Sequence, residues 1–234
     1  MKLWEDPRVA EGLQAQLDKR RALLAGGEKP LGWKLGLGAP GALARAQIPA
    51  PIIGYLLHSG LLASGATASV KGWKQPVAEP EIGVRLAADI APGSTAATAR
   101  AAIASLTPAI ELADLDPPPD PQNLAAILAG NFYQRHVVLS AQSRAGGDTA
   151  GLSSHVFRRG KLAAETTEPE ALTGKLPDLL VHLADTLGAF GEKLKAGDLV
   201  ICGSTTPPPL IEPDEVDFSY TLKPIGEVAV RFSR

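Results

Sequence analysis

Apolar and polar positions alternate with a period of two along much of this chain, which predicts many short β-strands. Residues 153–157 and 161–165 flank a short Arg-Arg-Gly turn and predict a hairpin. The other predicted strands are 31–37, 54–57, 67–71, 76–86, 108–114, 136–140, 199–203, 216–222 and 226–232.

The apolar period changes to three or four residues in a few segments, which predict helices. Residues 8–25 place Val9, Leu13 and Leu17 on one face. The remaining predicted helices are 96–106, 122–128 and 177–195. Residues 38–53 follow neither period, and a loop of this length in a compact domain is commonly functional or mobile.

Two carboxylates stand two positions apart in the predicted strand 76–86. Residues i and i+2 of a strand point to the same side, so Glu79 and Glu81 aim at one point. Carboxylates this close repel each other unless a positive charge or water lies between them. A metal ion, the guanidinium of Arg85 on the same face, and solvent are all candidates.

A third carboxylate favours a metal ion, rather than arginine or solvent, as the group that neutralises Glu79 and Glu81. Glu111 lies in the otherwise apolar strand 108–114, and burying it costs several kcal/mol unless it is paired. Glu79, Glu81 and Glu111 on adjacent strands would form an all-oxygen site, which hard ions such as Mg²⁺ or Mn²⁺ prefer.

Two further segments carry candidate chemistry. Lys34, between glycines on a short strand, is either a partly buried proton-transfer group or a lysine that extends to solvent. Ser204 and Thr206 follow the buried strand 199–203, where they either bind a carboxylate or form an ordinary turn. The four histidines show no metal-ligand spacing, and Cys202 is expected to pack as a small hydrophobic residue.

Composition narrows the classes of protein. The chain has 234 residues and a formal net charge of -2, which predicts neither a nucleic-acid nor a membrane partner. Its 24 glycines and 20 prolines favour strands and turns over a helix bundle. One cysteine excludes an internal disulfide, and residues 1–10 lack an apolar signal core, so we expect a cytoplasmic protein.

Four segments, in order, resemble the bacterial 2-keto-4-pentenoate hydratase and 4-oxalocrotonate decarboxylase group of the fumarylacetoacetate hydrolase superfamily. They are 32–37 (GWKLGL), 79–82 (EPEI), 109–114 (AIELAD) and 196–204 (AGDLVICGS).

The resemblance implies an α+β fold, a mixed β-roll or barrel-like structure, in one catalytic domain spanning 1–234. Residues 1–30 would be its helical segment and 31–234 its β-rich core. It also implies a homo-oligomer.

The resemblance further implies Mg²⁺ or Mn²⁺ on Glu79, Glu81 and Glu111. The substrate would be a short 2-keto or 2-hydroxydienoic acid from aromatic catabolism, which the enzyme hydrates or decarboxylates through a metal-stabilised enolate. Lys34 would move protons, and the substrate-binding residues would be Ser204, Thr206 and Asn131.

One departure from the group keeps other functions open. Its hydratases carry an acidic residue and a tyrosine where this chain has Ile52 and Ile53. An acylpyruvate-type hydrolase or a keto–enol tautomerase could use the same metal site. A family member that has lost catalysis and serves as a binding or assembly subunit is the third alternative.

Overall fold

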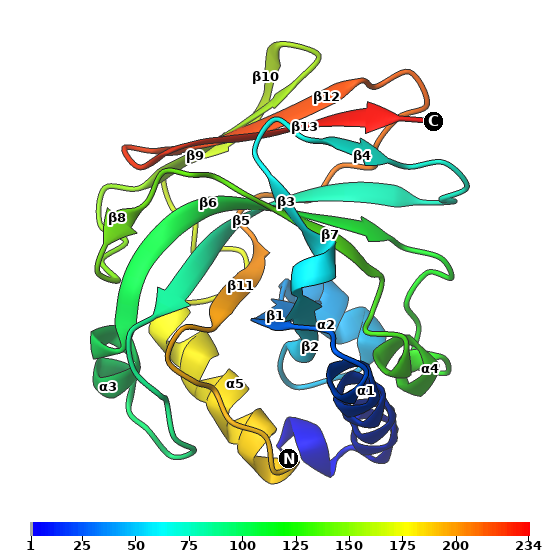
Figure 1. Ribbon diagram of the computed structural model, residues 1–234, viewed down its shortest axis with the longest axis vertical. Helices are drawn as coiled ribbons and strands as arrows, with labels where there is room; N and C mark the ends of the chain where they lie inside the picture. Colours follow the sequence, from blue (N-terminus) through cyan, green and yellow to red (C-terminus); the bar gives the residue numbers. More distant parts are fainter. Residues whose placement is uncertain (1) are drawn as a thin grey trace.

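Figure 1 shows a computed structural model of the protein, which describes residues 2–234. The helices are α1 (Pro7–Ala25), α2 (Pro40–Ala46), α3 (Ala96–Ala101), α4 (Leu124–Ala129) and α5 (Leu176–Ala189), with 3-10 turns η1 (Leu3–Glu5) and η2 (His58–Gly60). The strands are β1 (Pro30–Gly36), β2 (Ile52–Leu57), β3 (Leu61–Ala63), β4 (Thr67–Ser69), β5 (Pro76–Leu86), β6 (Ile103–Asp114), β7 (Gln134–Leu139), β8 (Arg144–Ala145), β9 (Ser153–Arg158), β10 (Lys161–Thr166), β11 (Leu199–Ser204), β12 (Asp217–Lys223) and β13 (Gly226–Ser233).

The larger sheet has the strand order β2-β1-β11-β5-β6-β7-β3, with β8 attached to β6. The pairs β1–β11 and β3–β7 are parallel and the others are antiparallel. Its long central strands curl, so that β6 arches over β1, β2 and β11 (Figure 1). The result is a mixed half-barrel whose concave side is open to one end.

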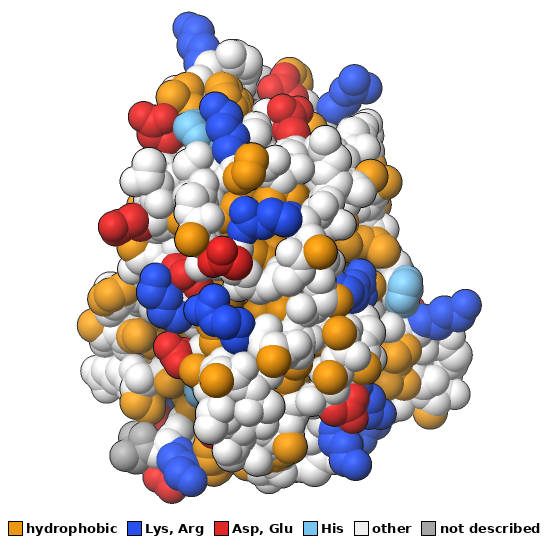
Figure 2. Space-filling view, turned by 90° about the vertical axis from the view of Figure 1, so that its left-hand side faces the viewer, with side chains coloured by type: hydrophobic (Ala, Val, Ile, Leu, Met, Phe, Trp, Pro, Cys, Tyr) orange, Lys and Arg blue, Asp and Glu red, His pale blue; other side chains and the backbone are white. Residues whose placement is uncertain are grey.

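The smaller sheet, β10-β9-β12-β13-β4, lies over the curled sheet at the top of Figure 1. Strand β12 alternates buried and less buried positions, which is the pattern of a sheet with one face on the core. Phe218, Tyr220 and Leu222 are its buried residues. The molecular face in Figure 2 carries basic and acidic side chains interspersed, without a large area of one sign.

Helices α1, α4 and α5 lie below the curled sheet (Figure 1). Val9, Leu13 and Leu17 of α1 are fully buried, as the helical period predicts. Gly12 allows α1 to lie against α4, because a β-carbon there would come within 2.6 Å of Leu128. Among residues 2–234, no helix is long and apolar enough to cross a membrane.

Three predicted boundaries are wrong. The helix predicted over 96–106 ends at Ala101, because Ile103 already pairs with Leu86 as the start of β6. The segment 38–53 is not all loop: it contains α2 and the start of β2. The helix predicted over 177–195 ends at Ala189. In the first case pairing between distant strands overrides the local preference of an Ala-rich segment for a helix.

Candidate metal centre and pocket

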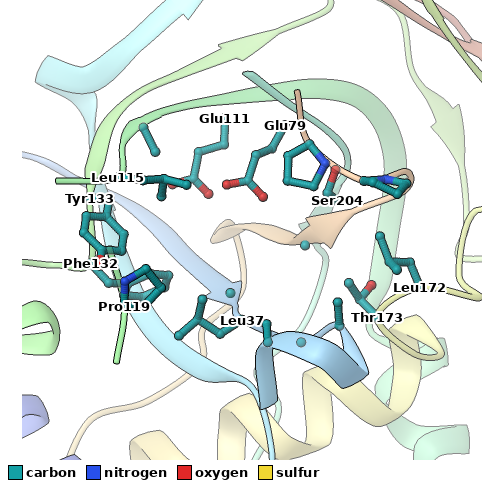
Figure 3. A pocket seen from close by; sticks show the side chains of 18 of the residues that line it. Leu37, Glu79, Glu111, Leu115, Pro119, Phe132, Tyr133, Leu172, Thr173 and Ser204 are labelled. Atoms are coloured by element: carbon teal, nitrogen blue, oxygen red, sulfur yellow. The ribbon is translucent and has the colours of Figure 1, made fainter. Parts of the chain in front are cut away.

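The central strands β5 and β6 bring the three predicted carboxylates to one wall. Glu79 lies directly opposite Glu111, and Glu81 lies between Ala109 of β6 and Ser204 of β11. Glu81 and Glu111 are buried, at 0% and 2% exposure, whereas Glu79 is half-buried. In Figure 3 the carboxylates of Glu79 and Glu111 point side by side into the pocket.

Lys34 is the cation at this wall. It lies in the middle of β1 with 1% exposure, so the alternative that it extends to solvent is wrong. Its Nζ forms an ion pair with Glu111 and donates a hydrogen bond to the carbonyl oxygen of Phe132 at 3.1 Å. The same Nζ lies 3.7 Å from the centre of the Phe132 ring, which adds a cation–π contact.

The segment 131–133 holds that carbonyl oxygen in place through an uncommon backbone conformation. Asn131, Phe132 and Tyr133 have φ angles of 61°, 24° and 72°, a region that costs L-residues roughly 1–2 kcal/mol each. The Phe132 ring packs on Gly36 and Gly54, where a β-carbon would lie 2.4 and 2.6 Å from it. Strain of this kind persists only where surrounding contacts hold it.

The Asn131 side chain is one of those contacts. Its Oδ1 accepts a hydrogen bond from the Tyr55 amide at 2.9 Å, and its Nδ2 donates to the Tyr55 carbonyl oxygen at 3.0 Å. Asn131 does not line the pocket. Substrate binding by Asn131 therefore stays a prediction, and the geometry assigns its amide to holding the segment 131–133 against β2.

Negative charge exceeds positive charge at this wall. Burial, followed by the charge of Glu111, raises the pKa of Glu79 to about 7. Burial also raises the pKa of Glu81, and the charges of Glu111 and Glu79 add to this effect. The Gly203 amide, which donates to Glu81 Oε2 at 2.6 Å, acts in the opposite direction.

Arg85 does not supply the missing positive charge. Its guanidinium donates to the Gly197 carbonyl oxygen at 2.8 Å, and the charge of Asp198 lies nearby. The idea that Arg85 neutralises Glu79 and Glu81 is therefore wrong. Glu81 Oε1 is buried and has no hydrogen-bond partner among the described residues.

These residues fit a hard divalent ion by their chemistry, although their side chains are not gathered around one point. Within residues 2–234 no three carboxylate, imidazole or thiol groups are already arranged as a ligand set. Glu111 is engaged by Lys34 and Glu81 by Gly203. The unpartnered Oε1 of Glu81, the excess negative charge and the all-oxygen donors match the ligand preference of Mg²⁺ or Mn²⁺.

The end of β11 forms the neighbouring wall. Gly203, with φ of 91°, turns the chain so that its amide faces Glu81. Ser204 lines the pocket, and its hydroxyl donates to the Thr206 carbonyl oxygen at 2.6 Å. Thr206 Oγ1 is buried without a partner and does not line the pocket. The structure thus places Ser204, but not Thr206, within direct reach of a ligand.

The pocket in front of these groups has a volume of about 380 Å³. Its remaining lining is mostly apolar or small: Gly36, Leu37, Gly38, Ala39, Gly41, Ala42, Ala46, Ala113, Leu115, Pro119, Phe132, Tyr133, Leu172, Thr173, Pro207 and Pro208, together with Arg45. No histidine is among the lining residues. His182, for example, bonds to the Pro51 carbonyl oxygen, and His136 stacks on Trp73.

Sequence patterns missed much of this lining. Helix α2 and the loops around Pro119 and Leu172 carry no periodic signal, and Phe132 has no local feature that points to Lys34. One signal was present: Gly36 follows Lys34 by two residues on β1 and Gly54 pairs directly with Lys34 on β2, and glycines within strands indicate that another group approaches the backbone closely there.

Comparisons with known proteins agree with the fold. A model of the fumarylacetoacetate (FAA) hydrolase C-terminal family matches residues 37–233. The 2-hydroxyhexa-2,4-dienoate hydratase of Comamonas testosteroni is 28% identical over 231 residues, covering 96% of this chain and 86% of that protein.

Two solved structures show the same architecture. The 4-oxalocrotonate decarboxylase from Pseudomonas putida G7, complexed with magnesium and adipate, superposes with a TM-score of 0.86 at 24% identity, covering 96% of this chain and 86% of that chain. The fumarylpyruvate hydrolase from Pseudomonas aeruginosa, in complex with Mn²⁺ and pyruvate, superposes with a TM-score of 0.66 at 11% identity, covering 86% and 88%. The predicted α+β fold of this type is confirmed. The names of the hydratase and the decarboxylase support a lyase-type enzyme.

Proposed function

The chain belongs to the fumarylacetoacetate (FAA) hydrolase C-terminal family, and we propose that it is a divalent-metal-dependent lyase acting on a short 2-keto or 2-hydroxydienoic acid. One observation carries the proposal. Glu79 and Glu81 of β5 and Glu111 of β6 lie on one wall with the buried cation Lys34, and Oε1 of Glu81 has no partner among the described residues. Lys34, Glu79 and Glu111 line a pocket of about 380 Å³, whereas Glu81 does not line it; this volume lies within the range of small-molecule sites.

Glu79, Glu81 and Glu111 would hold Mg²⁺ or Mn²⁺. When bound, the ion supplies positive charge that polarises the carboxylate and 2-oxo oxygens of the substrate. Ser204, at the end of β11, donates a hydrogen bond to the substrate carboxylate in place of its present bond to the Thr206 carbonyl oxygen. The apolar lining holds the carbon chain and excludes water.

Lys34 is the proton-transfer group of this proposal. Its ammonium is held by Glu111 and by the Phe132 carbonyl oxygen, so it has a fixed position at the reacting end of the pocket. This arrangement also accounts for Ile52 and Ile53, which are both fully buried. Glu111 and the segment 131–133 hold Lys34, and no acidic residue before Gly54 is required.

Metal titration tests the first half of the proposal. Calorimetry with Mg²⁺ and Mn²⁺ should give about one ion per chain, and Glu81→Gln should abolish binding. Glu11→Gln, at an exposed position of α1, is the matched control and should bind as the unmodified protein does. Absence of binding at millimolar metal would refute a metal-dependent enzyme.

Ultraviolet absorbance tests the second half. Loss of 2-hydroxypenta-2,4-dienoate or 4-oxalocrotonate in the presence of metal supports a hydratase or a decarboxylase. Turnover of acylpyruvates or oxaloacetate alone would instead indicate the hydrolase or tautomerase alternative. Metal binding without turnover of any of them would favour the non-catalytic subunit.

Location and assembly belong to the same proposal. We propose a cytoplasmic homo-oligomer. Cys202 is a free, buried thiol, which suits a reducing compartment. Leu162, Leu210 and Val216 are large apolar residues with 51–59% exposure, and contact with a second copy would cover them. Light scattering after size exclusion measures the assembly, and a monomer at micromolar concentration would contradict it.

A further inference from the structure

A chain of hydrogen bonds joins the smaller sheet to the strand that carries Glu79 and Glu81. Thr205 follows β11, and its amide and its Oγ1 both donate to the Pro80 carbonyl oxygen of β5, at 2.8 and 3.2 Å. The Oγ of Ser154, on β9, lies 2.7 Å from the same Oγ1. Because the Thr205 hydroxyl has one proton and donates it to Pro80, Ser154 is the donor to Thr205. Both hydroxyl residues are buried, at 0% and 4% exposure.

Strand pairing alone holds this point of β5 weakly. Pro80 has no amide hydrogen, so it cannot donate a bond to a neighbouring strand. In addition, the register between β5 and β11 shifts between Ile201 and Ser204, and such an irregularity disrupts the ladder of backbone bonds locally. The hydroxyls of Thr205 and Ser154 therefore supply fixation where the ladder is incomplete.

The position of Pro80 decides where two of the three proposed metal ligands lie. Pro80 stands between Glu79 and Glu81 in the chain, so a shift of its peptide unit would move both carboxylates. The Gly203 amide, which donates to Glu81 Oε2 at 2.6 Å, belongs to the same turn at the end of β11. The two hydroxyls thus fix β5 against the turn that also holds a ligand.

We propose that Ser154 and Thr205 are positioning residues that fix the carboxylates of β5 for a divalent ion, so that the smaller sheet contributes to metal affinity. Neither residue lines the pocket, so they act through β5 and not on the substrate. This inference rests on the proposed function, because that function places the ion at Glu79 and Glu81. The plain alternative is a buried bond between the two sheets that contributes to stability alone.

Calorimetric titration with Mn²⁺ separates these possibilities without an activity assay. Thr205→Val removes the hydroxyl at nearly constant size and should raise the Mn²⁺ dissociation constant about 10–100-fold, the usual effect of removing a group that orients metal ligands. Thr205→Ser keeps the hydroxyl and should restore most of the affinity. Ser154→Ala should weaken binding by less, and should add little to Thr205→Val, because Ser154 acts through Thr205.

Thr186→Val is the matched control. Thr186 is fully buried in α5, and its hydroxyl donates to the His182 carbonyl oxygen at 2.8 Å, so this change removes a similar bond away from β5. It should leave Mn²⁺ affinity unchanged.

Three outcomes would overturn the inference. An unchanged dissociation constant in Thr205→Val, or in Ser154→Ala if Thr205→Val does not fold, would mean that the hydroxyls serve stability alone. An equal increase in Thr186→Val would show that metal affinity merely follows stability. In both cases Mn²⁺ binding by the unmodified protein would still support the proposed function, whereas absence of that binding would overturn both.

Discussion

The two ends of the pocket are built in opposite ways. At one end, Lys34 of β1, Glu79 and Glu81 of β5 and Glu111 of β6 project from strands of the larger sheet, and all but the half-buried Glu79 are buried. At the other end, the seven-residue helix α2 and loops rich in Gly and Pro carry an exposed arginine. Hydrogen-bonded strands hold reacting groups in fixed positions, whereas loops can change between relatives without loss of the core. We infer that the first end sets the reaction, whereas the lining of the second end is free to vary between relatives.

The largest expected effect comes from removing Lys34, the cation at the carboxylate end of the pocket. Lys34→Met should lower turnover about 10²–10⁴-fold, because a positioned proton-transfer group typically contributes this much. Metal affinity should fall far less, since Lys34 is not a proposed ligand. Initial rates and calorimetry measure the two quantities, with Lys161→Met at an exposed position of β10 as control. Equal losses of both would mean that Lys34 is structural.

Glu79 and Glu81 should make the stabilisation of the folded protein by Mg²⁺ depend on pH. The pKa of Glu79 rises from 4.5 to about 7 on folding, and that of Glu81 also rises. The folded protein thus binds more protons, so without metal its stability falls as pH increases from about 4.5 through about 7.

Glu79 alone accounts for a decrease of at most about 3 kcal/mol in the free energy of unfolding. The decrease is smaller in practice because this side chain is only half-buried. A divalent ion favours the ionised carboxylates, so the Tm increase caused by Mg²⁺ should be larger at about pH 8 than at about pH 5. Thermal melts with NaCl at matched ionic strength provide the control. The same Mg²⁺ shift at both pH values would contradict the shared carboxylate site.

The next largest effect should come from a change in the segment 131–133. Asn131→Ala removes both bonds to Tyr55 and places alanine at a positive φ, so the free energy of unfolding should fall by about 2–4 kcal/mol. The folded fraction should lose kcat, since Phe132 no longer holds Lys34. Urea unfolding and steady-state kinetics measure these changes. Unaltered stability with a raised KM would instead support direct substrate contact by Asn131.

Arg85 should show the smallest effect. Its bond to the Gly197 carbonyl oxygen is worth about 1 kcal/mol or less, so Arg85→Ala should change the free energy of unfolding by no more than this. Metal affinity should not change, because the guanidinium bonds to the Gly197 carbonyl oxygen and forms no ion pair with Glu79 or Glu81 among the described residues. A clear change in the Mg²⁺ dissociation constant on calorimetry would instead indicate that Arg85 neutralises Glu79 and Glu81.

Local periodicity was sufficient for part of this protein. Alternation placed Glu79 and Glu81 on one side of a strand, and the core positions Val9, Leu13 and Leu17 followed from a helical period. These features depend only on the repeat of the backbone, which is the same in any strand or helix. The strands that carry Glu79, Glu81 and Glu111 could therefore be predicted from the sequence.

Only the tertiary structure decided how the site is held together. Lys34 meets Glu111 and the Phe132 carbonyl oxygen across 77 and 98 residues of chain. The choice between helix and strand after Ala101 depended on pairing with β5. No local pattern contains such information, because contact between distant residues depends on strand register and on the burial that the assembled sheet provides. The sequence determined which groups could meet on one wall, and the fold determined that a lysine completes that wall.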